Sequence, residues 1–343
     1  MLPWTAEFAG RIDEHVFASD LLRGNSLGDP HERPLWVYVP PGYDEGDRRY
    51  PTVYVIQGYT GHIAMWRNRT PWRQPFIELA DGIFAREEAP PAIVVYVDAW
   101  TSVGGSQYLD SPGTGQYHSY LCDEVVPWVD EHYRTMPATA HRAITGKSSG
   151  GYGAMITPML RPDLFGALAT HAGDALFEST YQKDFPQVAR LLRDNYDGSY
   201  DNFLADFRGG RIVGTKDTDF PLIETYGYAS CYSADEDGTV RIPFDDIGAT
   251  VPEVWDRWLR WDPVRMAARP EFAEALHSLK AIWIDAGTQD EYYLDFGAVA
   301  FRRALAKAGV RDDVVRLELF EGKHGAIEYR YPLALAWLTE RIS

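Results

Sequence analysis

The chain has 343 residues, of which 45% are hydrophobic and 24% are charged, a composition typical of folded globular proteins and not of disordered or collagen-like chains. Fifty acidic residues against 33 basic residues give a formal net charge of −17, which disfavours binding to nucleic acid and to anionic membrane surfaces. The two cysteines, Cys122 and Cys231, lie far apart in the sequence, so we expect two reduced thiols and neither a zinc site nor a disulfide framework.

The first half of the chain alternates short β-rich runs with stretches of helical periodicity. The predicted strands are residues 35–39, 52–56, 93–97, 142–145 and 167–171, and the predicted helices are residues 72–87, 120–133 and 151–160. These strands are apolar on both faces, which is typical of a parallel sheet covered by helices on both sides. The pattern predicts an α/β fold.

The alternation stops after residue 173 and resumes near residue 276. The later predicted strands are residues 281–285 and 314–320, and the later predicted helices are residues 296–308 and 326–340. No linker rich in glycine and serine separates two independent domains. We therefore expect one α/β core, built from residues 1–173 and 276–343, into which residues 174–275 are inserted as a lid or cap.

A Gly-x-Ser-x-Gly motif follows the predicted strand 142–145 directly. Residues 146–150 read Gly-Lys-Ser-Ser-Gly and lead into a helix rich in small residues. In a tight strand-to-helix turn of this kind, Gly146 and Gly150 leave the backbone room, and Ser148 is presented at the carboxyl edge of the sheet as a nucleophile. We expect Lys147 to be a polar turn residue.

A serine hydroxyl needs a base that a third group orients, in the chain order serine, acid, histidine. Asp290 follows the predicted strand 281–285, and His324 follows the predicted strand 314–320, so both lie on loops at the same edge as Ser148. Glu291 and Asp174 are alternative candidates for the orienting acid. The order predicts a catalytic triad of Ser148, Asp290 and His324.

An oxyanion needs two fixed N–H donors. The backbone N–H of Ser149, directly after the nucleophile, is one candidate. The loop after strand 52–56 reads Gln-Gly-Tyr-Thr-Gly and offers the N–H of Tyr59 as the other, with Gly58 as the second choice.

These motifs together resemble the Putative esterase family of α/β-hydrolases, which includes esterase D (S-formylglutathione hydrolase) and the mycolyltransferases. The resemblance rests on residues 57–59, 146–154, 287–292 and 322–324, and it covers most of the chain, roughly residues 34–173 and 281–343. It implies an α/β-hydrolase fold and a serine hydrolase that uses no cofactor. It also implies the same three triad residues and an oxyanion loop in which Tyr59 follows the glycine.

Candidate substrate contacts are less sharply defined. They are Gly58, Tyr108 on a glycine-rich loop, and Trp255 and Trp258, which recur at helical spacing. The tryptophans fit either the packed core of the lid or a hydrophobic substrate wall. The sequence has no His-Glu-x-x-His or comparable cluster, so we expect no metal.

The sequence thus predicts a serine esterase that cleaves small carboxylic esters through an acyl-enzyme. An acyltransferase and a thioester hydrolase that use the same triad remain alternatives, and a scaffold without catalysis is a further one. The N-terminus shows no secretory signal and no apolar run approaches membrane-spanning length, so we expect a soluble, cytoplasmic protein, with a homodimer left open. The acidic surface is expected to favour neutral esters over anionic ones.

Overall fold

The computed structural model describes residues 7–210 and 212–343. Residues 1–6 lie outside the described residues. They include part of the N-terminal stretch on which the expectation of no secretory signal rests. Among the described helices, none is both long and apolar enough to cross a membrane.

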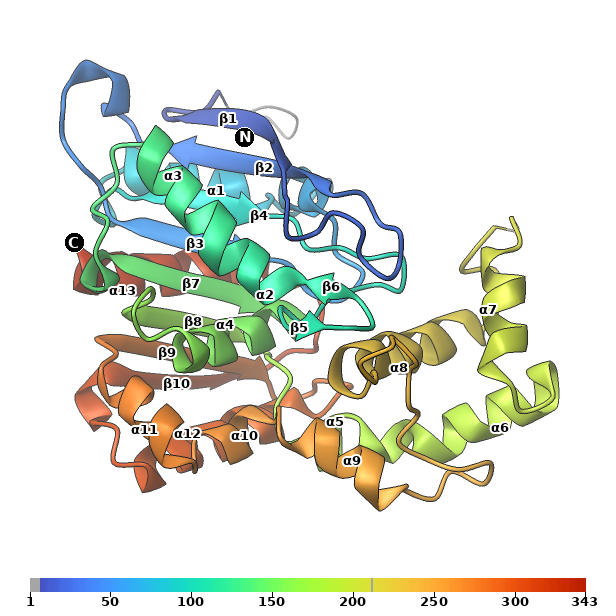
Figure 1. Cartoon of the computed structure of the whole chain (residues 1–343). Coiled ribbons are helices and arrows are strands. Elements are labelled where there is room, and N and C mark those ends of the chain that lie inside the picture. The colour runs from blue at the N-terminus through green and yellow to red at the C-terminus, as the bar shows by residue number, and fades with distance from the viewer. Residues whose placement is uncertain (1–6, 211) are drawn as a thin grey trace.

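An eight-stranded sheet with the order β1-β2-β4-β3-β7-β8-β9-β10 forms the centre of the molecule (Figure 1). Its strands are β1 (Arg11–Ala18), β2 (Glu32–Val39), β3 (Thr52–Ile56), β4 (Ile93–Val97), β7 (Arg142–Lys147), β8 (Ala167–His171), β9 (Ala281–Gly287) and β10 (Val315–Phe320). From β4 to β10 every neighbouring pair is parallel, whereas β2 pairs antiparallel with β1 and with β4. Two short strands, β5 (Asp110–Ser111) and β6 (Gly115–Gln116), form a separate ribbon.

Helices cover both faces of the sheet, as the sequence predicts. The helices are α1 (Phe76–Ala85), α2 (Tyr117–Ser119), α3 (Val126–His132), α4 (Ser149–Leu160), α5 (Phe177–Thr180), α6 (Phe185–Tyr196), α7 (Tyr200–Arg208), α8 (Asp219–Tyr232), α9 (Pro252–Leu259), α10 (Pro263–Met266), α11 (Pro270–His277), α12 (Leu294–Lys307) and α13 (Tyr331–Ile342). Along β3, Val53 and Val55 pack with α1 and α13, while Tyr54 and Ile56 pack with α3 and α4 on the opposite face. The predicted α/β class with a mostly parallel sheet is confirmed.

The predicted elements agree with the structure best in the centre of the sheet. Strands β3, β4 and β8 have the predicted bounds, while the predicted helix over residues 120–133 consists of a π-helical stretch, Tyr120–Val125, and α3. Strand β1 is missing from the prediction. It is an edge strand in which exposed side chains alternate with partly buried ones from Asp13 onward, and its one neighbour in the described sheet is β2.

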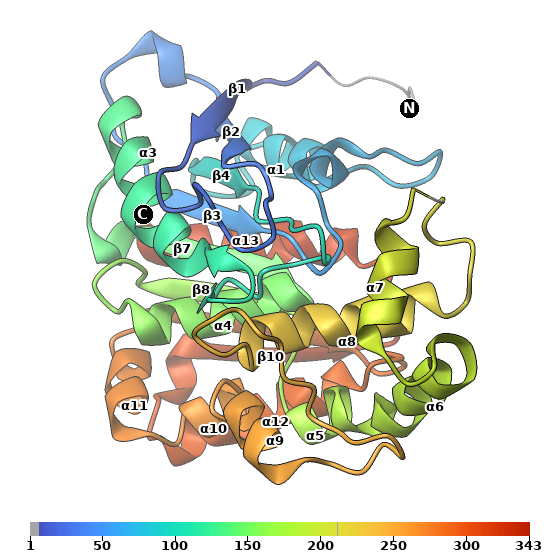
Figure 2. The same cartoon turned by 45° about the vertical axis from the view of Figure 1, so that its right-hand side comes forward.

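Residues 174–275 connect two adjacent strands, β8 and β9, and form helices α5 to α11. Figures 1 and 2 show α6, α7, α8 and α9 beyond the carboxyl ends of the strands, while α10 and α11 lie beside the core helices. Phe177, Leu222 and Trp258 from this segment share one hydrophobic core with the sheet. Its role as a lid over the site remains a prediction.

Candidate active site

Ser148 occupies a strained turn between β7 and α4. Its backbone has φ 58° and ψ −126°, a conformation that is rare for a residue with a side chain and that typically occurs where function requires it. The Ser148 N–H donates to the carbonyl of His171 at 2.9 Å, and the Ser148 carbonyl accepts from the N–H of Tyr152 at 2.8 Å. The turn is therefore held by the neighbouring strand on one side and by the first turn of α4 on the other.

Two glycines make this turn possible. A Cβ atom on Gly150 would lie 2.4 Å from the carbonyl oxygen of Ile56, and one on Gly146 would lie 2.5 Å from the backbone of Gly150. Both distances are well below van der Waals contact. The structure thus gives the physical reason for the two glycines of the Gly-x-Ser-x-Gly motif.

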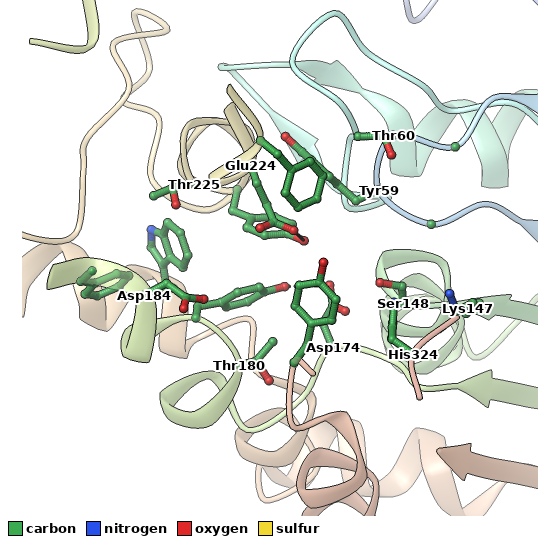
Figure 3. Close-up of a pocket in the computed structure, with 18 of the residues that line it drawn as sticks. Tyr59, Thr60, Lys147, Ser148, Asp174, Thr180, Asp184, Glu224, Thr225 and His324 are labelled. Atoms are coloured by element: carbon green, nitrogen blue, oxygen red, sulfur yellow. Dashed lines mark hydrogen bonds between the residues drawn. The ribbon is translucent and has the colours of Figure 1, made fainter. Parts of the chain in front are cut away.

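Asp290 and His324 form a hydrogen-bonded pair on the loops after β9 and β10. Asp290 Oδ2 lies 2.8 Å from His324 Nδ1, and Asp290 Oδ1 accepts from the backbone N–H of Tyr292 at 2.8 Å. Asp290 is buried, whereas His324 reaches the same cavity as Ser148 (Figure 3). Since Nδ1 is engaged by the carboxylate, Nε2 is the ring nitrogen left for a reacting hydroxyl.

The two alternative acids have other partners. Glu291 accepts a hydrogen bond from the backbone N–H of His324 at 3.0 Å, so it fixes the loop and not the ring. Asp174 is buried on the cavity wall, where burial raises the pKa of its carboxyl. Its Oδ2 accepts from the hydroxyls of Ser149, at 3.1 Å, and Tyr181, at 2.8 Å.

Asp285 forms a second aspartate–histidine pair below the site. Its carboxylate lies 2.8 Å from Nδ1 of His171 and 3.1 Å from Nε of Arg330, and all three residues are buried. Burial opposes ionisation, but these partners hold the pKa of Asp285 below its usual range. The network joins β8 and β9 to the turn before α13, and neither Asp285 nor His171 lines the cavity.

The two candidate oxyanion donors flank Ser148. A Cβ atom on Gly58 would lie 3.3 Å from Cβ of Ser148, which places the loop after β3 directly against Ser148. No described residue accepts a hydrogen bond from the Tyr59 N–H. Ser149 is the first residue of α4, where backbone N–H groups have no acceptor within the helix. The Tyr59 hydroxyl lies 2.5 Å from the carbonyl oxygen of Val103, which anchors the loop.

The cavity at this edge has a volume of about 240 Å³. Its ionisable lining consists of Lys147, Asp174, Asp184, Glu224 and His324, in addition to tyrosines. Its aromatic lining consists of Tyr59, Tyr181, Phe185, Phe220, Tyr228, Trp258 and Tyr292. Pockets for drug-sized ligands typically measure ~300–1,000 Å³, so this cavity suits a small substrate.

Only some of the four candidate substrate contacts line the cavity. Gly58 and Trp258 line the cavity. Trp255 lies behind the wall, where its ring packs 5.8 Å from that of Trp258. Tyr108 is buried beneath α4 and donates its hydroxyl to the carbonyl of Gln57 at 2.7 Å, so it supports the oxyanion loop from below.

Sequence reasoning missed the wall opposite Ser148. Tyr181, Glu224 and Tyr228 come from α8 and the turn before α6, in segments without a recognisable motif. Most of α8 is buried, polar residues included, so its burial does not single out Glu224. Lys147 also reaches the cavity, and burial lowers the pKa of its ammonium group.

Neither a metal cluster nor a reactive thiol is found in the described part of the chain. No group of three or more histidine, cysteine or acidic side chains there could hold a metal ion. Cys122 and Cys231 are free and buried, and burial raises the pKa of each thiol.

A family model described as Putative esterase matches residues 25–331. The chain is 26% identical over 134 residues to an endo-1,4-beta-xylanase/feruloyl esterase of Xylanibacter ruminicola, a match that covers 38% of this chain and 18% of that protein. The chain spans less than two thirds of the length of the first curated relatives it matches, between 18% and 59%.

Solved structures share the fold over nearly the whole chain. A ferulic acid esterase has a TM-score of 0.60 at 18% identity, covering 98% of this chain and 100% of that chain. An S-formylglutathione hydrolase from Agrobacterium tumefaciens has a TM-score of 0.56 at 18% identity, covering 99% and 98%. With most of its length matched by the family model and its fold shared with these hydrolases, the chain belongs to the Putative esterase family.

Proposed function

We propose that this chain hydrolyses small carboxylic esters through an acyl-enzyme on Ser148. The observation that carries the proposal is the convergence, at one cavity, of a strained serine turn with a histidine that is hydrogen-bonded to a buried aspartate. Membership of the Putative esterase family agrees with it, and so does the fold that the chain shares with a ferulic acid esterase and an S-formylglutathione hydrolase.

In the first half of the reaction, Ser148 Oγ bonds to the ester carbonyl carbon while His324 Nε2 takes the hydroxyl proton. Asp290 stabilises the imidazolium that forms. The backbone N–H groups of Ser149 and Tyr59 stabilise the oxyanion. When the carbon–oxygen bond to the alcohol breaks, His324 returns the proton to the leaving oxygen.

In the second half, water adds to the acyl carbon and gives its proton to His324. The acyl–Ser148 bond then breaks, the carboxylic acid leaves, and Ser148 recovers its proton. Neither half requires a cofactor or a redox partner. Residues 174–275 supply the wall that faces Ser148 and act as the cap that selects the substrate. A cytoplasmic location remains a prediction, and a homodimer remains open.

The test is turnover of p-nitrophenyl esters of increasing acyl length, with and without an alcohol acceptor. Ser148→Ala should lower kcat/KM by at least about 10³-fold, because the nucleophile is removed. Ser26→Ala, an exposed serine on a loop away from the cavity, is the matched control and should retain activity. A fluorophosphonate probe should label the control but not Ser148→Ala.

Each alternative has its own outcome in this experiment. Ester products in place of free acid when alcohol is added would indicate an acyltransferase. Thioesters of the same acyl lengths are included in the comparison, and turnover confined to them would indicate a thioester hydrolase. Full ester turnover by Ser148→Ala, or no probe labelling of the unmodified chain, would exclude the proposed mechanism.

A further inference from the structure

The cavity wall that faces Ser148 is rich in carboxylates. Asp174 follows β8, Asp184 precedes α6 and Glu224 lies on α8, so three separate segments bring an acid to one small cavity. Figure 3 shows Ser148, Lys147 and His324 on one side of the cavity, and Glu224 and Asp184 on the other. Like charges this close repel one another, and an apolar aromatic wall does little to screen that repulsion.

Glu224 and Asp174 have no cationic partner in the described part of the chain. The hydrogen bond to Glu224 comes from the hydroxyl of Tyr228 at 3.3 Å, and those to Asp174 come from neutral donors. Asp184 differs, because it pairs with Lys183 at 2.6 Å. Asp174 is buried and Glu224 is partly buried. An acid in such a place either stays protonated or pairs with a cation, so at a pH that ionises them these two side chains leave a place for a cation.

The same wall contains closely packed aromatic rings. Ring centroids are 5.0 Å apart for Tyr59 and Tyr228, 4.6 Å for Tyr228 and Tyr181, and 5.6 Å for Tyr181 and Trp258. The hydroxyl of Tyr181 is engaged with Asp174 and that of Tyr228 with Glu224. A phenol that donates to a carboxylate carries more negative charge on its ring, which strengthens its attraction for a cation. Carboxylates and aromatic rings in one cavity are the groups that recognise ammonium ions.

We propose, on the basis of the esterase function proposed above, that the preferred substrate is a small ester that carries an ammonium group. The ammonium group lies against Glu224, Asp174 and the tyrosine rings while the ester carbonyl lies at Ser148. Lys147, beside Ser148, repels a cation from that end and so gives the bound ester one orientation. The ammonium group can belong to the acyl part or to the alcohol part, and the experiment distinguishes the two.

Both experiments are run at pH 9, above the pKa of Glu224, which burial raises to about 8. The first experiment compares isosteric esters in which a trimethylammonium group replaces a tert-butyl group. Butyrylcholine and 3,3-dimethylbutyl butyrate carry the change in the alcohol. The p-nitrophenyl esters of 4-(trimethylammonio)butanoic acid and 5,5-dimethylhexanoic acid carry it in the acyl group. In one pair, kcat/KM should be at least about tenfold higher for the cationic ester, since one such contact contributes roughly 0.5–2 kcal/mol and two carboxylates add to it.

The outcomes separate this proposal from the esterase function on which it rests. Equal kcat/KM within both pairs, with the neutral esters hydrolysed, would overturn the cation proposal and leave the esterase function in place. No turnover of any of the four esters would overturn both. A preference in the alcohol pair alone assigns the cavity to the leaving group, and one in the acyl pair alone assigns it to the acyl group.

The second experiment assigns the preference to Glu224. Glu224→Gln should reduce the ratio of cationic to neutral kcat/KM to within about threefold of one, and taking the ratio within one variant cancels any general loss of activity. Glu236→Gln makes the same change of charge at an exposed position between α8 and α9 and should keep the original ratio. An unchanged ratio in Glu224→Gln would overturn the proposal.

Discussion

Asp290 and Glu291 are adjacent acids that contact different atoms of His324. Asp290 is bonded to the ring at Nδ1, whereas Glu291 is bonded to the backbone N–H. Asp290→Asn can donate to Nδ1 and so favours the tautomer with the proton on Nε2, which cannot act as a base. We expect kcat for p-nitrophenyl acetate to fall by about 10³–10⁴-fold in this variant.

Glu291→Gln is the matched control, because an amide oxygen can still accept the bond from the His324 backbone. Its kcat should stay within about threefold of that of the unmodified chain, since the ion pair that it removes, between Glu291 and Lys323, is exposed and weak. If kcat fell by a similar factor in both variants, the loss would come from disturbance of the loop and not from the contact between Asp290 and the His324 ring. Thermal unfolding of both variants checks that each is folded.

Glu224 should make the preference for cationic esters depend on pH. Burial, with the nearby carboxylates of Asp174 and Asp184, raises the pKa of Glu224 to about 8, although Tyr228 and Lys183 oppose the shift. Below this pKa the group is a neutral acid, and above it the group is a carboxylate that attracts a cation. The ratio of kcat/KM for a quaternary ammonium ester to that for its neutral isostere should therefore rise between pH 7 and pH 9.

The ratio isolates Glu224 from the groups that both esters share, because a group that both reactions need in the same protonation state affects the two kcat/KM values equally. In Glu224→Gln the ratio should be flat across the same pH range. A flat ratio in the unmodified chain would show that Glu224 does not titrate in contact with the substrate.

The residues that belong to a sequence motif could be predicted from the sequence. The residues that form the cavity wall opposite Ser148 could not. Ser148 and Asp290 follow the buried strands β7 and β9, and His324 follows the edge strand β10. Parallel strands bring the loops that follow them to one edge. Glu224 and Tyr181 reach the cavity only through the packing of α5 to α8 against one another. Helix packing of that kind leaves no local pattern at the positions that face inward.

At the scale of elements, the turn between β7 and α4 depends on close backbone contact with β3. Gly150→Ala would place a Cβ atom 2.4 Å from the carbonyl oxygen of Ile56. Backbone atoms cannot move aside as a flexible side chain can, so β3 and α4 must separate. We expect the free energy of unfolding to fall by about 1–3 kcal/mol, measured by urea denaturation.

Gly325→Ala provides the control for this change, because a Cβ atom there meets no atom within 4 Å. It should alter the free energy of unfolding by less than about 0.5 kcal/mol. If Gly150→Ala and the unmodified chain had equal free energies of unfolding, the backbone at this turn could move enough to accommodate a Cβ atom, contrary to what its contacts indicate.

The elements themselves show which sequence patterns are reliable. Strands β3 and β4 are buried along their whole length, so a run of apolar β-branched residues between turn residues locates them. Strand β1 carries charges at Arg11, Asp13 and Glu14 because it lies at the sheet edge, where none of its residues is fully buried. An edge strand of this kind is specified by its pairing with β2, which no local window reveals.

At the scale of the whole molecule, the net charge of −17 acts on the same substrates as the cavity does, but over a longer range. The Debye length falls from ~10 Å at 0.1 M salt to ~3 Å at 1 M, so salt screens this long-range attraction while contacts inside the cavity persist.

Raising NaCl from 20 mM to 500 mM should therefore lower kcat/KM for a cationic ester by about two- to fivefold. The same change should leave kcat/KM for the neutral isostere unchanged. It should raise kcat/KM for an anionic ester such as a succinate monoester. Glu224→Gln should keep this salt dependence although it loses the preference, because 49 of the 50 acidic residues remain. A salt effect of the same sign on cationic and anionic esters would contradict an electrostatic origin.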